Sequence, residues 1–272
     1  MGEDWFKNCL PVAYYDQFIG EGIYPDGRSI SSFVPLSFKL GAWGGVGSSL
    51  IRHGGVAVSC CVQASLALCH DGPLLNFEVK ACSAVSQGEI NDVVSLLNEV
   101  FRNKAFDFPT VLLVKGTEDT IPMTWELTLN IQILSSAGPI ADVAICAVSA
   151  ALLNVRLPAI KLAHIKDNES PIEAGEITVL DETTPLVLKK FPVAVTIYVF
   201  KNGKQDVVLV DPPEEVTEYC QAKVSLVTVG EYVLAMHTRG MVTSDRILSS
   251  IAALAEQRHR DVVSVIRQED GP

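Results

Sequence analysis

Alternation of apolar and polar residues predicts a set of β-strands along the chain. In the clearest run, 123–133, Met, Trp, Leu and Ile alternate with Thr, Glu, Asn and Gln. A second long run, 56–69, places apolar residues at every other position between mostly smaller ones. A period of two indicates strands with one face in the core. Shorter strands are expected at 33–40, 48–52, 193–200, 207–210, 223–229 and 232–237.

Four other segments repeat their apolar residues with the period of an α-helix. The best defined covers 86–101 and opens with Ser-Gln-Gly-Glu, which is a capping box. The segment 140–154 is apolar on most sides, so we expect a helix buried between two layers. A helix over 10–19 begins at a proline and ends before two glycines, and a final helix starts near 244–245.

The order of these elements predicts an α+β fold made of two halves packed together, each with helices on one side of a sheet. Antiparallel hairpins favour this class over a doubly wound parallel sheet. The polar, turn-rich residues 161–190 are expected to connect the halves. We therefore expect a helical lead-in at 1–22, a first domain at 23–160, the connecting segment, and a second domain at 191–272 that ends in a helix.

The balance of charges bears on what the chain can bind. Its formal net charge is -11, from 21 Lys and Arg against 32 Asp and Glu. Affinity for RNA comes largely from neutralised phosphates, so RNA contact would need a local basic loop or basic groups from partners. The charge also disfavours an anionic membrane surface. No apolar run approaches the roughly 18 residues of a membrane helix, so we expect a soluble, intracellular protein without a membrane partner.

Seven cysteines are present, and none forms a C-x-x-C pair. Their spacing predicts neither a disulfide framework nor a metal site, and we expect no cofactor. Small buried cysteines in a reducing compartment are the simplest interpretation. The sequence Cys69-His70-Asp71 leaves open an unrelated enzyme with a Cys–His nucleophile, although no third group is evident. His53, beside two glycines, is interpreted as a hairpin residue that tolerates unusual backbone angles.

Three stretches resemble the ribonuclease PH family of exosome ring subunits. Residues 24–28, Tyr-Pro-Asp-Gly-Arg, are similar to the family's Arg-x-Asp-Gly-Arg motif, with Tyr24 in place of the first Arg. Residues 47–62 are similar to its Gly-Ser strand pair, and 142–158 to its helix-to-strand passage, which is the most specific of the three. The resemblance runs from about residue 11 to about residue 265.

Residues 13–19 and 255–262 look most like the non-catalytic ring subunits of eukaryotes. The resemblance implies the ribonuclease PH fold and a structural role in the six-membered ring of the RNA exosome, in 3′-to-5′ RNA processing and degradation, including rRNA processing. The implied partners are other ribonuclease PH-like subunits, RNA-binding cap subunits, hydrolytic ribonucleases and the RNA that passes through the ring. The implied location is the nucleus and nucleolus, and also the cytoplasm.

The resemblance also locates a phosphate site that has been altered. Active relatives bind phosphate with a Gly-Thr/Ser-Arg triplet at a helix N-terminus, where free N–H groups and a guanidinium hold the anion. The matching residues here are Gly138, Pro139 and Ile140. Pro139 has no N–H to donate, and Ile140 replaces the guanidinium with an aliphatic side chain. A degenerate phosphate site is therefore expected.

Active relatives carry two acidic residues six positions apart, the second just before a Met-Pro-Val-Ala segment. Counting back from Phe-Pro-Val-Ala at 191–194 places Thr184 and Lys190 at these positions. Asp181 and Glu182 lie nearby and could enter the site only through a shifted loop. We therefore expect no catalytic residues and no enzyme. The alternatives are an active phosphate-dependent exoribonuclease and a composite site shared with a neighbouring subunit.

Three cations are candidates for RNA contact. In active relatives an arginine pair precedes the helix that opens near residue 87, and the corresponding loop here, 78–86, contains only Lys80. Arg102 and Lys104 follow the same helix. These side chains could line an RNA path, or they could be ordinary solvated charges.

Overall fold

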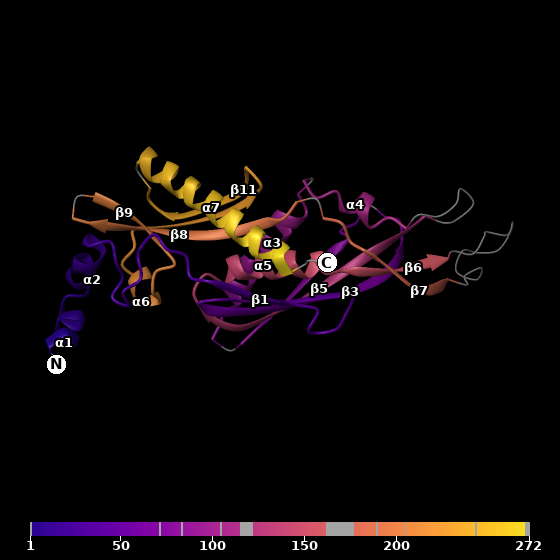
Figure 1. Cartoon of the computed structure of the whole chain (residues 1–272), viewed down its shortest axis with the longest axis horizontal. Helices are drawn as coiled ribbons and strands as arrows, with labels where there is room; N and C mark the ends of the chain where they lie inside the picture. The colour runs from indigo at the N-terminus through magenta and orange to yellow at the C-terminus, as the bar shows by residue number, and fades with distance from the viewer. Residues whose placement is uncertain are drawn as a thin grey trace.

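The structure, a computed structural model, stacks two sheets and their helices in four layers (Figure 1). It describes residues 2–70, 72–82, 84–103, 105–114, 122–161, 177–188, 190–203, 205–242 and 244–269. From the bottom of Figure 1 upward, the layers are a five-stranded sheet, two helices, a four-stranded sheet and the C-terminal helix. The expected α+β class and the two sheet-plus-helix halves are confirmed.

The first sheet contains five strands, all antiparallel except for one pair. In spatial order they are β1 (Leu36–Leu40), β2 (Gly47–His53), β3 (Gly55–Leu68), β5 (Met123–Ala137) and β4 (Leu75–Ala81). The parallel pair is β4 with β5. We expected residues 78–86 to form a loop, and this was wrong up to Ala81. Strand β4 alternates Leu75, Phe77 and Val79 toward the core, and its backbone pairs with β5.

The second sheet lies between two layers of helix. Its order is β11 (Tyr232–Gly240), β10 (Ala222–Val229), β8 (Pro192–Asn202) and β9 (Gln205–Val210). Helix α7 (Asp245–Glu269) covers one face, where Ile251 and Ala255 pack against Val195, Ile197 and Val224. Because the other face packs on the helices of the first half, nine consecutive residues of β8 are buried.

Helix α5 (Ile140–Leu153) is the centre of the molecule. It packs against β2 and β3 on one side and β8 on the other. The buried hydroxyl groups on both sides of this helix have hydrogen-bond partners. Ser49 Oγ of β2 donates to the Ala147 carbonyl at 2.7 Å, and Ser149 Oγ donates to the Pro192 carbonyl at 3.2 Å. The predicted burial of this helix between layers is confirmed.

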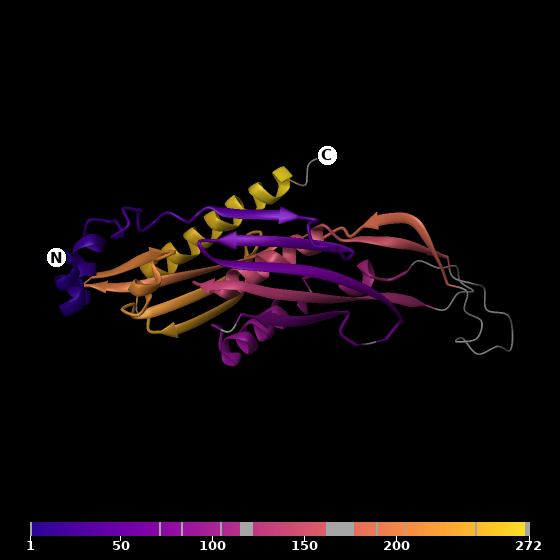
Figure 2. The same ribbon diagram turned by 90° about the horizontal axis from the view of Figure 1, so that it is seen from below.

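Helix α3 (Gln87–Phe101) lies beside α5 and over β4. The predicted capping box is confirmed, because Ser86 Oγ accepts the Glu89 N–H at 3.2 Å and the Glu89 carboxylate accepts the Ser86 N–H at 2.9 Å. Figure 2 looks onto the opposite face of the five-stranded sheet, and no helix of the described ranges lies over it.

Shorter elements complete the described chain. They are α1 (Gly2–Cys9), α2 (Pro11–Gly20), α4 (Phe108–Val111), α6 (Glu214–Thr217) and the two-stranded sheet of β6 (Arg156–Lys161) with β7 (Thr178–Pro185). Part of the expected connecting segment, 161–190, is therefore a strand. Within the described ranges, no helix has both the length and the apolar character needed to span a membrane.

Candidate functional site

The N-terminus of α5 opens into a groove of about 490 Å³ between α3 and the strands β10 and β11. Charged side chains of both signs line this groove. The carboxylates come from α3 and the basic groups from the second sheet: Glu89, Asp92, Glu99, Lys223, His237 and Arg239. His237 Nε2 lies 3.0 Å from a Glu99 carboxylate oxygen, which links the two walls. Sequence reasoning did not single out these basic residues, because they belong to strands of the other half.

The predicted degenerate triplet lies at this helix end. Gly138 has a φ of 141°, Pro139 occupies the N-cap position without a side-chain cap, and Ile140 lines the groove. In the first turn, Asp142 is buried and accepts a hydrogen bond from Thr196 Oγ1 at 2.8 Å. Burial raises the pKa of Asp142 to about 6. The helix end therefore offers a proline and an isoleucine at the groove, with the Asp142 carboxyl group buried behind them.

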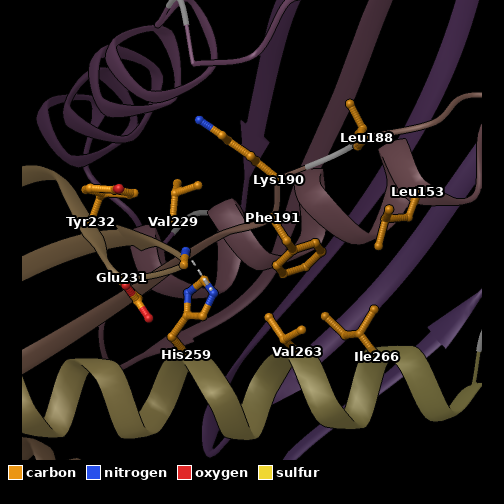
Figure 3. A pocket seen from close by; sticks show the side chains of 11 residues that line it. Leu153, Leu188, Lys190, Phe191, Val229, Glu231, Tyr232, His259, Val263 and Ile266 are labelled. Carbon is orange, nitrogen blue, oxygen red and sulfur yellow. Dashed lines mark hydrogen bonds between the residues drawn. The ribbon is translucent and has the colours of Figure 1, made fainter.

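The two positions matched to the acidic pair lie elsewhere. Lys190 lines a second, mostly apolar pocket of about 400 Å³ together with Leu153, at the C-terminal end of α5 (Figure 3). Thr184 lies on β7 and donates its hydroxyl to the Leu157 carbonyl at 3.3 Å. Ile140 and Leu153 are the ends of α5, which spans about 20 Å at 1.5 Å per residue. The structure does not bring the two groups of residues together.

A histidine forms part of the second pocket. His259 Nε2 accepts the Gly230 N–H at 3.1 Å, and Nδ1 lies 3.1 Å from Thr228 Oγ1. Because an N–H group can only donate, Nε2 carries no proton in this arrangement. Burial lowers the pKa of His259, which also favours the neutral ring. His259 therefore fixes the turn between β10 and β11.

The three predicted RNA contacts do not form one cluster. Lys80 is exposed on β4, before α3, whereas Arg102 is the exposed C-cap residue at the far end of α3. Lys104 lies outside the described residues. Lys80 and Arg102 are therefore separate features of the surface.

A buried hydrogen bond between a histidine and a carboxylate joins the two halves, and the sequence analysis missed it. His53 Nε2 lies 2.9 Å from Asp211 Oδ2, and each side chain is 8% exposed. The same carboxylate oxygen accepts the Val34 N–H at 2.9 Å. Burial raises the pKa of Asp211, but the hydrogen bond and charge of His53 outweigh it and hold that pKa below its usual value. The interpretation of His53 as a hairpin residue was incomplete, because its partner lies 158 positions away.

The Tyr24–Arg28 motif contributes to this junction. Tyr24 is fully buried and donates its hydroxyl to the Val210 carbonyl at 2.7 Å. Arg28 donates to the Asp211 carbonyl at 3.2 Å, and its guanidinium carbon lies 5.2 Å from the centre of the Tyr24 ring. The motif therefore attaches the N-terminal segment to the end of β9.

The Cys69–His70 alternative is not supported by the geometry. His70 Nε2 lies 2.6 Å from a Glu126 carboxylate oxygen, and Nδ1 accepts the Gly72 N–H at 2.8 Å. With both nitrogens engaged, the ring offers no base to the Cys69 thiol. Asp71 lies outside the described residues. In the described part of the chain, no group of three or more His, Cys, Asp or Glu residues could hold a metal ion.

Comparison of the whole architecture with solved structures gives a match over both halves. An archaeal exosome core subunit superposes with a TM-score of 0.71 over 98% of this chain and 100% of that one, at 20% identity. The chain has the ribonuclease PH fold of exosome core subunits.

Sequence comparison gives two relatives that are also named as exosome components. The chain is similar to exosome complex component Rrp42 of Pyrococcus abyssi, at 29% identity over 46% of this chain and 40% of that protein. It is also similar to exosome complex component rrp45 of Schizosaccharomyces pombe, at 25% identity over 76% of this chain and 70% of that protein. The matched part thus covers less than half of the archaeal relative. No family model matches the chain.

Proposed function

We propose that this chain is a non-catalytic ring subunit of the RNA exosome, of the exosome component eight type. Its partners are other ribonuclease PH-like subunits in a six-membered ring, RNA-binding caps, hydrolytic ribonucleases and the transiting RNA. It supports 3′-to-5′ RNA degradation and processing, rRNA processing included, in the nucleus, nucleolus and cytoplasm. The fold and the similarity to two exosome components support the assignment to the ring.

The observation that carries the non-catalytic assignment is the chemistry of the α5 N-terminus. Phosphorolysis requires a bound phosphate and groups that stabilise charge in the transition state. Pro139 has no backbone N–H to donate, and Ile140 has an aliphatic side chain where a guanidinium is needed. The groove is lined by three carboxylates from α3 and three basic residues from the second sheet, so its charges do not add up to a replacement for the missing anion clamp.

The positions matched to the acidic pair support the same conclusion. The Thr184 hydroxyl is engaged with a backbone carbonyl, and Lys190 lines a mostly apolar pocket at the opposite end of α5 from Ile140. Neither position supplies a carboxyl group, and neither adjoins the α5 N-terminus. Asp181 and Glu182 belong to β7 with Thr184, so they share its separation from the groove.

The first prediction concerns activity. Purified chain incubated with single-stranded RNA and inorganic phosphate should release no nucleoside diphosphate above a phosphate-free blank, because the anion clamp is missing. Chromatography of the products measures this. The double variant Pro139→Thr, Ile140→Arg should stay inactive, because it restores the clamp without the carboxylates. Phosphate-dependent release by the natural chain would refute the non-catalytic assignment.

The same assay on assembled rings tests the composite-site alternative. Rings with and without this subunit should show equal rates of phosphorolysis when the rate is divided by the number of active neighbouring subunits. Native mass measurement of the mixture tests membership separately. A monodisperse monomer that joins no ring would contradict the proposed function.

A further inference from the structure

The face of the five-stranded sheet that no described helix covers, called the uncovered face below, is mostly polar, although the opposite face belongs to the core. Along β2 and β3, buried residues such as Ile51, Cys60 and Val62 point toward α5 and alternate with more exposed ones. Those between them, such as Arg52 and Ser59, therefore point to the face seen in Figure 2. A solvated face places no demand on which polar residues occupy it, so the positions of its charges are informative.

Strand register places cations at both edges of one row across this face. The register pairs Lys39 with Leu50, Leu50 with Ser59, Ser59 with Gln132 and Gln132 with Lys80. Directly paired residues point to the same face. Four interstrand spacings separate Lys39 from Lys80, or about 19 Å. The side chains of Leu50, Ser59 and Gln132 lie between the two ammonium groups, so the row holds one apolar group, one hydroxyl and one amide.

Arg52 adds a third cation beside the first edge. It pairs with Ser37, two residues before Lys39, so Arg52 and Lys39 are diagonal neighbours. Arg52 is exposed, and so are Lys39 and Lys80. These three cations lie in two adjoining rows of a chain whose net charge is -11.

The acidic residues of this face lie further along the strands. Glu78 pairs with Asn130, one row from Lys80. Glu126 lies three rows away and is engaged with His70. Charge is therefore graded along the strands, and an anion would be drawn to the end that carries Lys39 and Arg52.

A glycine-rich loop brings a tryptophan onto the same face. Trp43 donates its backbone N–H to Ser48 Oγ at 3.1 Å, and Cys61 Sγ donates to the Gly44 carbonyl at 3.6 Å. Ser48 and Cys61 are paired residues of the uncovered face, because Ser49 points the other way, to α5. The loop therefore lies over the row next to the cations.

The loop conformation is fixed, whereas the indole is not covered. Gly45 has a φ of 73°, and a Cβ there would lie 2.4 Å from the Val62 carbonyl oxygen and 2.9 Å from Cys61 Sγ. Only glycine allows this approach to the sheet. The Trp43 side chain remains 55% exposed. The loop thus presents an exposed aromatic side chain over the row next to the one that begins at Lys39.

We propose that this face binds single-stranded RNA, with the backbone crossing the strands from Lys39 and Arg52 to Lys80 and a base stacked on Trp43. A flat aromatic surface, cations spaced for a phosphate backbone and adjacent hydroxyl and amide groups are the requirements of such a site. The choice of RNA as ligand rests on the proposed function. The binding surface itself rests on the sheet register and the Trp43 loop.

Fluorescence anisotropy with a labelled oligouridine tests the surface on the full-length chain. Trp43→Ala should weaken binding roughly tenfold, since base stacking on an aromatic ring is lost. Trp5→Ala is the matched control, because Trp5 is also exposed, on α1. RNA should quench the tryptophan fluorescence of the natural chain and of Trp5→Ala, and quench that of Trp43→Ala much less.

Charge reversals test the electrostatic part. Lys39→Glu, Arg52→Glu and Lys80→Glu should each weaken binding and flatten the slope of log affinity against log salt by about 0.7. Lys201→Glu, an exposed cation at the end of β8, should leave that slope unchanged. Circular dichroism and the unfolding midpoint confirm that each variant is folded.

Equal RNA affinity for Trp43→Ala, Lys80→Glu and the natural chain would overturn the inference. Unchanged RNA affinity combined with lost ring incorporation in Trp43→Ala would also overturn it and assign the face to a subunit contact. Ring incorporation is measured separately, so the two proposals can fail independently. A chain that joins no ring but binds RNA through Trp43 would contradict the proposed function and retain this surface.

Discussion

Replacing His53 by alanine should lower the free energy of unfolding by about 3–5 kcal/mol near neutral pH. The substitution leaves the Asp211 carboxylate buried without the ring that lies 2.9 Å from it. The Val34 N–H would remain as a partner, but one hydrogen bond does not offset the desolvation of a charge. Because the pair joins β2 to the end of β9, the loss weakens the contact between the halves.

Urea unfolding followed by circular dichroism measures this effect. Arg260→Ala is the control, because its pairing with Glu256 is on the surface of α7 and should be worth less than about 1 kcal/mol. The double variant His53→Ala, Asp211→Ala should recover part of the loss, because it removes the unpaired charge as well. A loss below about 1 kcal/mol for His53→Ala would show that Asp211 does not need its partner.

Asp142→Asn should raise the free energy of unfolding by roughly 2–3 kcal/mol near pH 7.5 and by little near pH 4. Burial raises the pKa of Asp142 from 3.8 to about 6 in the folded state. The folded protein therefore binds this proton more tightly than the unfolded chain does. The resulting stability is complete below the unfolded pKa and is lost as the pH rises through about 6. Asparagine never ionises, and its amide oxygen can still accept from Thr196.

Denaturation of the variant and the natural chain across this pH range gives the difference directly. The stability advantage of Asp142→Asn should grow between about pH 4 and 6 and then level off. Asp261→Asn, an exposed substitution on α7, should show no such growth. A difference that is independent of pH would mean that Asp142 titrates in the folded protein as it does in the unfolded chain.

Periodicity predicted most of the elements because most strands and helices are long or strongly amphipathic. The strand at 123–133 and the buried helix at 140–154 needed no information beyond their own residues. Strand β4 was missed because it is only seven residues long, and its outward residues, such as Glu78 and Lys80, look like a polar loop. Its parallel pairing with β5 could not be predicted from local sequence, because helix α3 separates the two strands along the chain.

The candidate sites were less accessible from sequence, because they depend on contacts between distant residues. The family resemblance matched Gly138, Pro139 and Ile140 to a triplet at a helix N-terminus, and these residues do lie at the start of α5. Nothing local indicated that Lys190 would lie at the opposite end of the same helix. The glycines around Trp43 were visible, but the contact of their loop with Ser48 and Cys61 depends on the strand register.

The central position of α5 also has a consequence for biosynthesis. This apolar helix emerges from the ribosome before the strands that cover its second side, since β8 begins at Pro192 and β11 ends at Gly240. At a synthesis rate of roughly 5–20 residues per second, that apolar side of α5 remains exposed on the nascent chain for several seconds or longer. We therefore expect the unfinished chain to require a chaperone. Fragments that end before β8 should aggregate when they are expressed alone.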